Sequence, residues 1–153
     1  MMELLQGREV RRYDSGEIVI EQGSRTGLLF FLIEGTVEIC RDGVPVSTAS
    51  HPGVVFGEMS ALLGCDHTAT VRAMNPCAFY IVDNPGDFLE SSPVICHDLC
   101  KLLAHRLDAL NKHLVNVKKK SDGNDNLGVL IGSLEAILHH HPARPLPVAR
   151  ARR

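Results

Sequence analysis

A change of sequence pattern at Pro93 divides the chain into two structural types. Between Val10 and Val82, short apolar or alternating runs are separated by turn-forming Gly, Pro, Asp and Asn residues. Runs of about four to seven residues at this spacing are typical of antiparallel sandwiches and barrels. After Pro93, 27 consecutive residues contain neither Gly nor Pro and are rich in helix formers. The sequence therefore predicts a mainly β, antiparallel domain with flanking helices, followed by one long helix.

The predicted strands can be read directly from the runs between the turns. They are VRRY, EIVIEQ, LLFFLIEG, TVEIC, VPVSTAS, ATVRA and CAFYIV. We expect turns at six glycines, several with positive φ: Gly16, Gly23, Gly27, Gly35, Gly43 and Gly53. The predicted organisation is a β domain over residues 1–92, the long helix over 93–120, and a short helix with a disordered basic tail over 121–153.

The long helix carries a heptad pattern that favours pairing with a second copy. Its apolar positions recur at alternating spacings of four and three residues: Cys96, Cys100, Leu103, Leu107, Leu110, Leu114 and Val117. A second apolar line, formed by Ile95, Leu99 and Leu102, accompanies this seam only in the first half of the helix. We therefore expect a homodimer through parallel pairing of the helix. The alternative is a helix that lies on its own sheet.

Length and composition restrict the remaining possibilities. A chain of 153 residues with a net charge of -2 corresponds to about one domain and has no overall electrostatic attraction to nucleic acid. No apolar run approaches the roughly 20 residues needed to span a membrane, so we expect a cytoplasmic protein. The five cysteines form no CxxC pair and are expected to be free thiols. His139–His141 are interpreted as surface residues.

Residues 57–73, GEMSALLGCDHTATVRA, contain the chemical groups that bind a small anion. Gly57 allows close approach of the backbone, Glu58 can accept hydrogen bonds from a ribose, and a short helical turn begins beside them. His67, Thr68 and Ala69 follow on the return strand.

This stretch resembles the phosphate-binding cassette of the cyclic-nucleotide-binding domain, GE-x-ALL-x(4)-R-[TSA]-A-T-V-x-A. The resemblance covers about residues 8–120, including EIVIEQGSRTGLLFFLIEGTVEI. It implies an eight-stranded antiparallel β-roll, or jelly roll (double-stranded β-helix), with a short cassette helix. It also implies a long C-terminal dimerisation helix, as in the sensor half of CRP/FNR regulators.

The resemblance implies a role for each matching residue. Gly57 and the backbone of Met59 and Ser60 would approach the ligand, and Glu58 would accept from the ribose 2′-hydroxyl. Thr68 and Ala69 would contact the phosphate. On the long helix, Leu110 stands where CRP-like sensors have a base-contacting threonine, and the neighbouring Asn111 is the candidate for contact with the base.

His67 occupies the position of the family's arginine. A histidine offers at most one donor to a phosphate and is mostly neutral at pH 7, so its substitution for arginine weakens binding by about one to two decades. If protonated His67 replaces the arginine, affinity rises on acidification and His67→Arg tightens binding.

Two functional interpretations remain open from the sequence. The first is a stand-alone cyclic-nucleotide sensor that binds cAMP or cGMP and signals through its C-terminal helix, with a protein effector as a further partner. The second is a degenerate CRP/FNR-like domain that acts as a dimeric interaction module, or as a truncated transcription regulator without its own helix-turn-helix.

Other functions find less support in the residues. No helix-turn-helix follows the long helix, so direct binding to nucleic acid is not expected. Catalysis is not expected either, because no catalytic constellation stands out and the β region offers only His51 and His67 for a cupin-like metal site. We expect no covalent cofactor and no metal ion. A haem or metal at Cys65 and His67 is a further alternative.

Overall fold

The computed structural model describes residues 2–120, with side chains described as far as Val117. The chain divides into two units, Met1–Lys101 and Leu102–Arg153. Helix α3 (Pro93–Lys120) begins in the first unit and continues into the second. The predicted boundaries 1–92, 93–120 and 121–153 stay predictions. The predicted tail, including His139–His141, lies outside the described residues.

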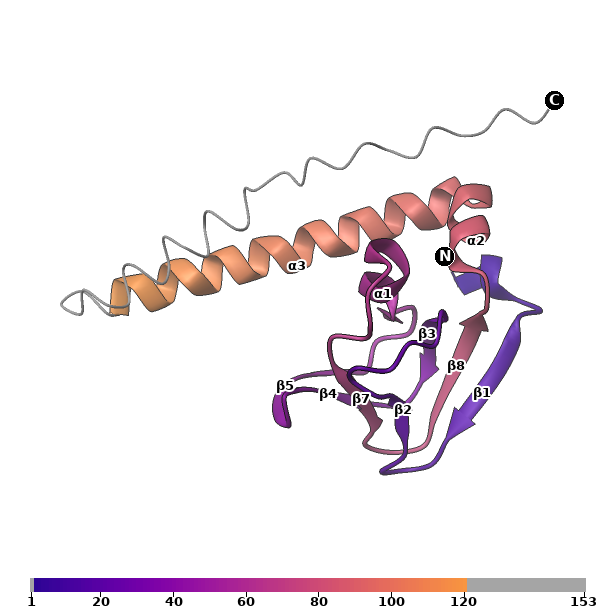
Figure 1. Cartoon of the computed structure of the whole chain (residues 1–153), viewed down its shortest axis with the longest axis horizontal. Coiled ribbons are helices and arrows are strands. Elements are labelled where there is room, and N and C mark those ends of the chain that lie inside the picture. Colours follow the sequence, from indigo (N-terminus) through magenta and orange to yellow (C-terminus); the bar gives the residue numbers. More distant parts are fainter. Residues whose placement is uncertain (1, 121–153) are drawn as a thin grey trace. The chain divides into compact units, whose positions relative to one another are not determined.

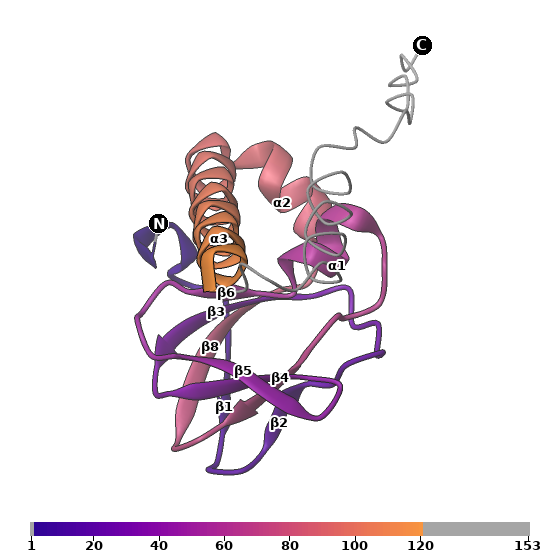
Figure 2. The ribbon, with the colours of Figure 1, turned by 90° about the vertical axis from the view of Figure 1, so that its left-hand side faces the viewer.

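The first unit contains two four-stranded antiparallel sheets (Figure 1). In the first sheet the strand order is β1 (Glu9–Tyr13), β8 (Cys77–Val82), β3 (Leu29–Glu34) and β6 (Val55–Phe56). In the second it is β2 (Ile18–Ile20), β7 (Thr70–Ala73), β4 (Val37–Arg41) and β5 (Val44–Ala49). Figure 2 shows the two sheets as stacked layers. The prediction of a mainly β antiparallel fold with flanking helices is confirmed.

Each of the seven runs read from the sequence contains a strand. The six glycines expected at turns all have positive φ, between 67° and 100°. At Gly35 the lack of a side chain is also required, because a Cβ there would lie 2.5 Å from the Sγ of Cys77. Strand β6, which is only two residues long, was not predicted from the sequence. With it, the described part of the chain has the eight strands that the resemblance implies.

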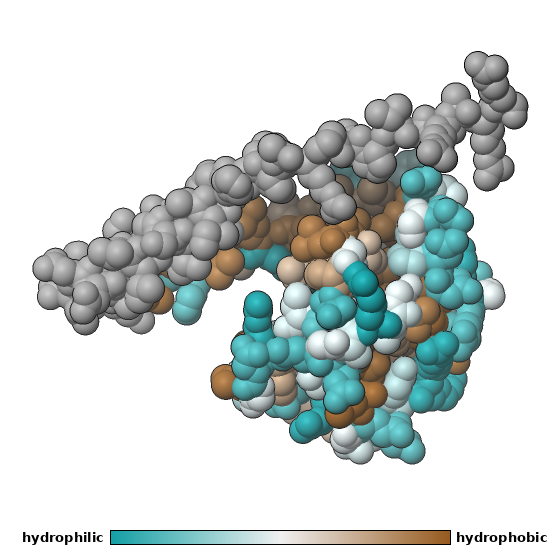
Figure 3. Space-filling model, viewed as in Figure 1, coloured by the Kyte–Doolittle hydropathy of each residue, from teal (hydrophilic) through white to brown (hydrophobic). Residues whose placement is uncertain are grey.

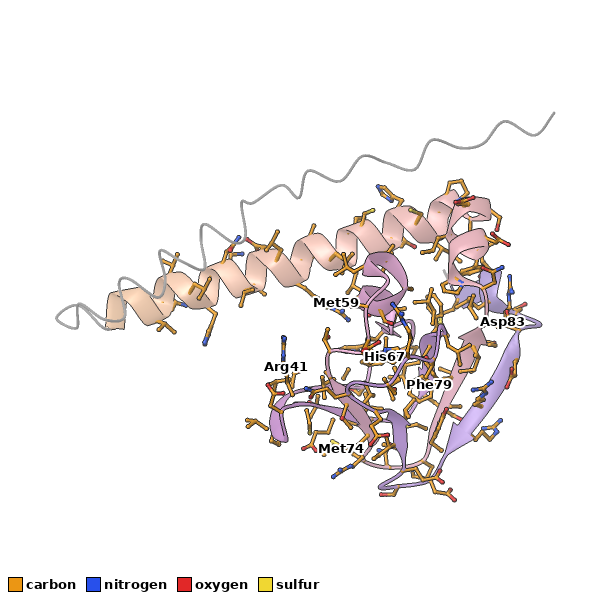
Figure 4. All side chains as sticks on the ribbon, in the orientation of Figure 1. Arg41, Met59, His67, Met74, Phe79 and Asp83 are labelled. Carbon is orange, nitrogen blue, oxygen red and sulfur yellow. The ribbon has the colours of Figure 1, made fainter. Side chains whose placement is uncertain are left out.

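The interior between the sheets is apolar and centred on Phe79, which is fully buried. The Phe79 ring makes edge-to-face contacts with Tyr13, Phe30 and Phe56, at centroid distances of 5.7, 6.3 and 6.3 Å. Such pairs stabilise beyond the area that they bury, by about 0.5–1.5 kcal/mol each. Figure 4 labels Phe79 within the roll.

The first four residues of strand β3 are buried, on both faces of the strand, which explains the continuous apolar run LFFLI. Phe30 and Leu32 belong to the interior cluster. Phe31 points to the other face, where its ring lies 6.2 Å from that of Phe88 in α2 (Pro85–Ser91). One face of β3 therefore closes the roll and the other supports a helix.

Three further helical segments belong to the first unit: η1 (Met2–Leu5), α1 (Glu58–Leu63) and α2. The sequence pattern predicts no helix at α2, because Asn84 and Pro85 also occur in turns. Asn84 caps it by accepting a hydrogen bond from the backbone N–H of Asp87, and Pro85 occupies its first turn. Both are recognised signals of a helix start.

Helix α3 changes in burial along its length. In the first unit Ile95 and Leu99 are 0% and 6% exposed. In the second unit the seam residues Leu107 and Leu110 are 45% and 48% exposed in the single chain. The structure contains one copy of the chain, so the pairing of two helices stays a prediction.

Candidate functional site

The cassette, defined as residues 57–69, connects β6 to β7 and contains α1. Its helical turn is closed by hydrogen bonds from the backbone N–H of Ala61 to the Gly57 carbonyl and from that of Gly64 to the Ser60 carbonyl, at 3.0 and 2.9 Å. The Ser60 hydroxyl then donates to the Cys65 carbonyl at 2.6 Å. These contacts turn the chain back after the helix and fix the path that leads to His67.

A loop between β2 and β3, residues 21–28, is bonded to the cassette at His67. The N–H of His67 donates to the Ser24 carbonyl at 2.9 Å, and the N–H of Gly23 donates to the His67 carbonyl at 2.8 Å. The Nε2 atom of His67 lies 2.7 Å from the Thr26 hydroxyl oxygen. Both the backbone and the side chain of His67 are therefore engaged by this loop.

The His67 side chain is turned into the protein and is 4% exposed (Figure 4). Burial lowers the pKa of His67 below its ordinary value of 6.5, and the nearby carboxylates of Asp66 and Glu58 only partly oppose this shift. At pH 7 the imidazole is therefore neutral, and one of its two nitrogens already has a partner in Thr26.

Gly57 is essential to the packing around this histidine. Its φ is +84°, and a Cβ there would lie 2.5 Å from the carbonyl oxygen of Leu28 and 3.4 Å from Cε1 of His67. The absence of a side chain at Gly57 lets the loop, the start of α1 and the imidazole come together. The predicted approach of Gly57 to a ligand stays a prediction.

The cassette also contains the buried polar side chains of the described part of the chain. Glu58, Ser60 and His67 are 5%, 7% and 4% exposed. Among residues 2–117 no buried side-chain nitrogen or oxygen lacks a hydrogen-bond partner. On the face shown in Figure 3, the surface over the strands of the first unit is mainly hydrophilic with scattered apolar side chains.

The predicted ligand-binding residues fall into two groups. Gly57, Glu58, Met59, Ser60, His67, Thr68 and Ala69 all belong to the first unit. Within this group, Thr68 Oγ1 lies 3.9 Å from the Met59 sulfur, which leaves the hydroxyl weakly held. Asn111 belongs to the second unit, so its contact with a ligand stays a prediction.

The loop residues that contact the cassette were not predicted from the sequence. Besides Ser24 and Thr26, Arg25 donates from Nη2 to the Gly64 carbonyl, and its Nε lies 3.7 Å from Asp66 Oδ1. Thr26 and His67 are 41 positions apart in the chain. No local pattern in GSRTG indicates such a partner, and only the resemblance could have suggested that this loop faces the cassette.

Comparison with known proteins assigns this arrangement to a family. Residues 10–90, more than half of the chain's 153 residues, match the Cyclic nucleotide-binding domain family. The chain therefore belongs to the cyclic nucleotide-binding domain family, and the resemblance read from the cassette is confirmed.

Individual relatives share the domain but differ in length. A cAMP-dependent protein kinase regulatory subunit from Yarrowia lipolytica is 36% identical over 80 residues, covering 52% of this chain and 21% of that protein. A cGMP-dependent protein kinase, isozyme 2, from Drosophila melanogaster is 28% identical over 100 residues, covering 54% of this chain and 9% of that protein. The chain thus matches only a small part of these relatives.

The fold is also shared with a solved structure. The Thermus thermophilus catabolite activator protein gives a TM-score of 0.65 at 22% identity, over 90% of this chain and 80% of that chain.

Within residues 2–120, no helix has both the length and the apolar character required to cross a membrane. In the same part of the chain, no group of three or more His, Cys, Asp or Glu residues is arranged to hold a metal ion.

Proposed function

We propose that this chain is a regulatory sensor domain that binds cAMP or cGMP at the cassette. In this proposal Glu58 accepts from the ribose, and the Thr68 hydroxyl and the backbone of Met59, Ser60 and Ala69 contact the cyclic phosphate. The buried His67 ring packs beside Gly57, and Asn111 meets the base.

One observation carries the proposal. Glu58, Ser60 and His67 are the buried polar side chains of the described chain, and all three belong to the cassette. No buried side-chain nitrogen or oxygen among residues 2–117 lacks a hydrogen-bond partner, so the burial of these groups is compensated. Their collection in one segment of an otherwise apolar interior marks the cassette as a polar site. Their position in a member of the cyclic nucleotide-binding family supports a retained ligand site.

Calorimetric titration with cAMP and with cGMP tests the proposal. Both ligands are needed, because the relatives include kinases named for each of them. We expect saturable binding of at least one cyclic nucleotide, with little binding of 5′-AMP, whose phosphate is not part of a ring. Glu58→Gln should weaken binding by about 10–100-fold, because a carboxylate acceptor contributes roughly 1.5–3 kcal/mol.

The absence of both heat and a thermal shift at millimolar cAMP and cGMP, at pH 6 and at pH 7.5, would overturn the proposal. The chain would then be a domain that keeps the fold without the ligand and serves as an interaction module. His67→Arg sharpens the result, because a restored guanidinium should tighten binding by about one to two decades if position 67 faces the phosphate.

We further propose that α3 pairs two copies of the chain and transmits the ligand signal. The support is the heptad spacing together with the exposure of Leu107 and Leu110, at 45% and 48% in the single chain. Parallel pairing would bury these residues and place the Cys96 and Cys100 side chains near their counterparts.

The pairing is tested by sedimentation of Leu110→Asp, which should shift the protein from dimer to monomer. Val115→Asp is the matched control, because Val115 is 46% exposed on the same helix but lies off the seam. A wild-type protein that sediments as a monomer would exclude the dimer, and an equal loss of dimer in both variants would exclude this seam.

A further inference from the structure

The cassette lacks a cation at the position where the family pattern has arginine. The ring at position 67 is 4% exposed and bonded to Thr26 through Nε2, and its burial lowers its pKa and so disfavours the charged form. A cyclic phosphate carries a full negative charge, and hydrogen bonds to ionised groups are about twice as strong as neutral ones. A positive charge from another segment would therefore strengthen binding at this cassette.

Arg25 is held beside the cassette by the backbone of its own loop. The two preceding residues, Gly23 and Ser24, bracket His67 through hydrogen bonds of 2.8 and 2.9 Å. Arg25 follows directly, and its guanidinium donates to the Gly64 carbonyl and lies 3.7 Å from the Asp66 carboxylate. Its Nη2 and Nε thus both meet cassette residues, between the end of α1 and His67.

The present partner of Arg25 holds it only weakly. The side chains of Arg25 and Asp66 are 61% and 63% exposed. Exposed ion pairs of this kind contribute at most about 1 kcal/mol, since water screens the charges and two long side chains lose freedom. An incoming phosphate can therefore compete with Asp66 for the guanidinium. The charge of Arg25 is permanent and its planar fork fits two phosphate oxygens.

We infer that Arg25 supplies the guanidinium contact to the cyclic phosphate, in place of the residue at position 67, and that Asp66 is the counter-ion that Arg25 leaves on binding. The inference rests on the proposed function, because it assigns the cation of the same site. In this arrangement His67 positions the loop through Thr26. The guanidinium contact to the phosphate, called here the Arg25 clamp, comes from the loop and not from the cassette.

Variants of both partners test the inference by calorimetric titration of the full chain with cAMP and cGMP. Arg25→Gln should weaken binding by about 10–100-fold, the loss expected for a charge-assisted contact. Arg25→Lys should recover part of the affinity, because it keeps the charge and loses the fork. Asp66→Asn should tighten binding by about 2–5-fold, since it removes the competing carboxylate.

Arg12 and Glu34 provide matched controls for charge and exposure. They form a surface pair at 3.3 Å, with side chains 75% and 65% exposed, on β1 and at the end of β3. Arg12→Gln and Glu34→Gln should leave the affinity within about twofold of wild type. Raising the salt concentration should weaken wild-type binding more than Arg25→Gln binding, because the variant has lost one screened charge contact.

The outcomes separate this inference from the proposed function. A wild-type chain that binds neither cyclic nucleotide overturns both. If wild type binds and Arg25→Gln binds equally well, the sensor function stands and the Arg25 clamp is wrong. The clamp is also wrong if Arg25→Gln lowers the melting temperature of the ligand-free protein without changing affinity, because Arg25 would then only tie the loop to the cassette.

Discussion

The interior of the roll and the cassette are both buried, but they bury different kinds of side chain. Around Phe79 the buried residues are apolar and contact one another through aromatic edges and aliphatic groups. In the cassette, Glu58, Ser60 and His67 are buried to a similar degree. The hydrophobic effect explains the first region, since burial of apolar surface is itself favourable. It does not explain the second, where each polar group needs a partner to offset its lost hydration.

The difference separates residues that stabilise the fold from residues that shape the site. A truncated side chain in the interior leaves a cavity, and the cost depends on the volume removed. A changed side chain in the cassette leaves a polar group without its partner or forces the loop away from α1. The two regions should therefore respond differently to substitution.

The largest effect is expected at the centre of the interior. Phe79→Ala should lower the free energy of unfolding by about 3–5 kcal/mol, because it removes a fully buried ring and three edge-to-face contacts. Urea denaturation followed by circular dichroism measures the change. Val46→Ala on β5, where Val46 is 58% exposed, should stay within about 0.5 kcal/mol of wild type. Similar losses at the two positions would contradict the assignment of the core.

A smaller loss is expected for Gly57→Ala in the cassette. A methyl group there would lie 2.5 Å from the Leu28 carbonyl oxygen and would also require a strained positive φ. We expect the free energy of unfolding to fall by about 2–3 kcal/mol and the loop of residues 21–28 to separate from α1. Faster amide hydrogen exchange in that loop would show the separation.

Gly64→Ala is the matched control for that experiment. Gly64 also has a positive φ, at +63°, but no atom lies within 4 Å of the position of its Cβ. The control should cost about 1–2 kcal/mol, the penalty of the left-handed conformation alone. If both variants lose the same stability, the close approach of Leu28 to Gly57 contributes nothing.

The sequence predicted most of the roll because its signals are local. The seven predicted strands and the six glycine turns depend on runs and spacings within a few residues of each other. The two-residue strand β6 is too short to show a period. The helix α2 was hidden by Asn84 and Pro85, which also occur in turns.

The candidate site was predicted only in part, for a physical reason. The cassette residues could be named from a contiguous pattern, and the departure at His67 was visible in it. Which group meets the imidazole depends on Thr26, which is 41 positions away and is brought close by the pairing of strands. Arg25 was missed for the same reason. Non-local contacts of this kind leave no periodic trace in the sequence.

The contact between Thr26 and His67 should be worth less than the steric fit at Gly57. Thr26→Val removes the hydroxyl and leaves Nε2 of a buried imidazole without its partner, which should cost about 1–2 kcal/mol. Thermal unfolding of Thr26→Val, His67→Phe and the double variant measures the coupling. If the two single losses simply add in the double variant, the contact carries no energy. Thr48→Val, at an exposed position of β5, should have little effect.

The smallest effect, and the one that best distinguishes two roles for His67, is the dependence of stability on pH. Burial lowers the pKa of His67 in the folded protein below its value of about 6.5 in the unfolded chain. Below pH 6.5 the unfolded chain therefore binds more protons at this residue than the folded protein, so acidification favours unfolding. Above pH 6.5 both states are neutral at His67 and its contribution is constant. As the pH falls from about 7.5 to about 5.5, the free energy of unfolding of wild type should therefore decrease more than that of His67→Gln.

This titration also separates burial from direct contact with the phosphate. If protonated His67 contacted the ligand, acidification would tighten cyclic-nucleotide binding while it destabilised the free protein, because the ligand would favour the charged ring. If Arg25 is the cation, affinity should stay flat or fall over the same range, since the guanidinium keeps its charge and the cassette loses stability. Stability and affinity measured at pH 7.5, 6.5 and 5.5 on wild type and His67→Gln give both trends. If acidification raises the affinity of wild type but not that of His67→Gln, the phosphate contact belongs to position 67 and not to Arg25.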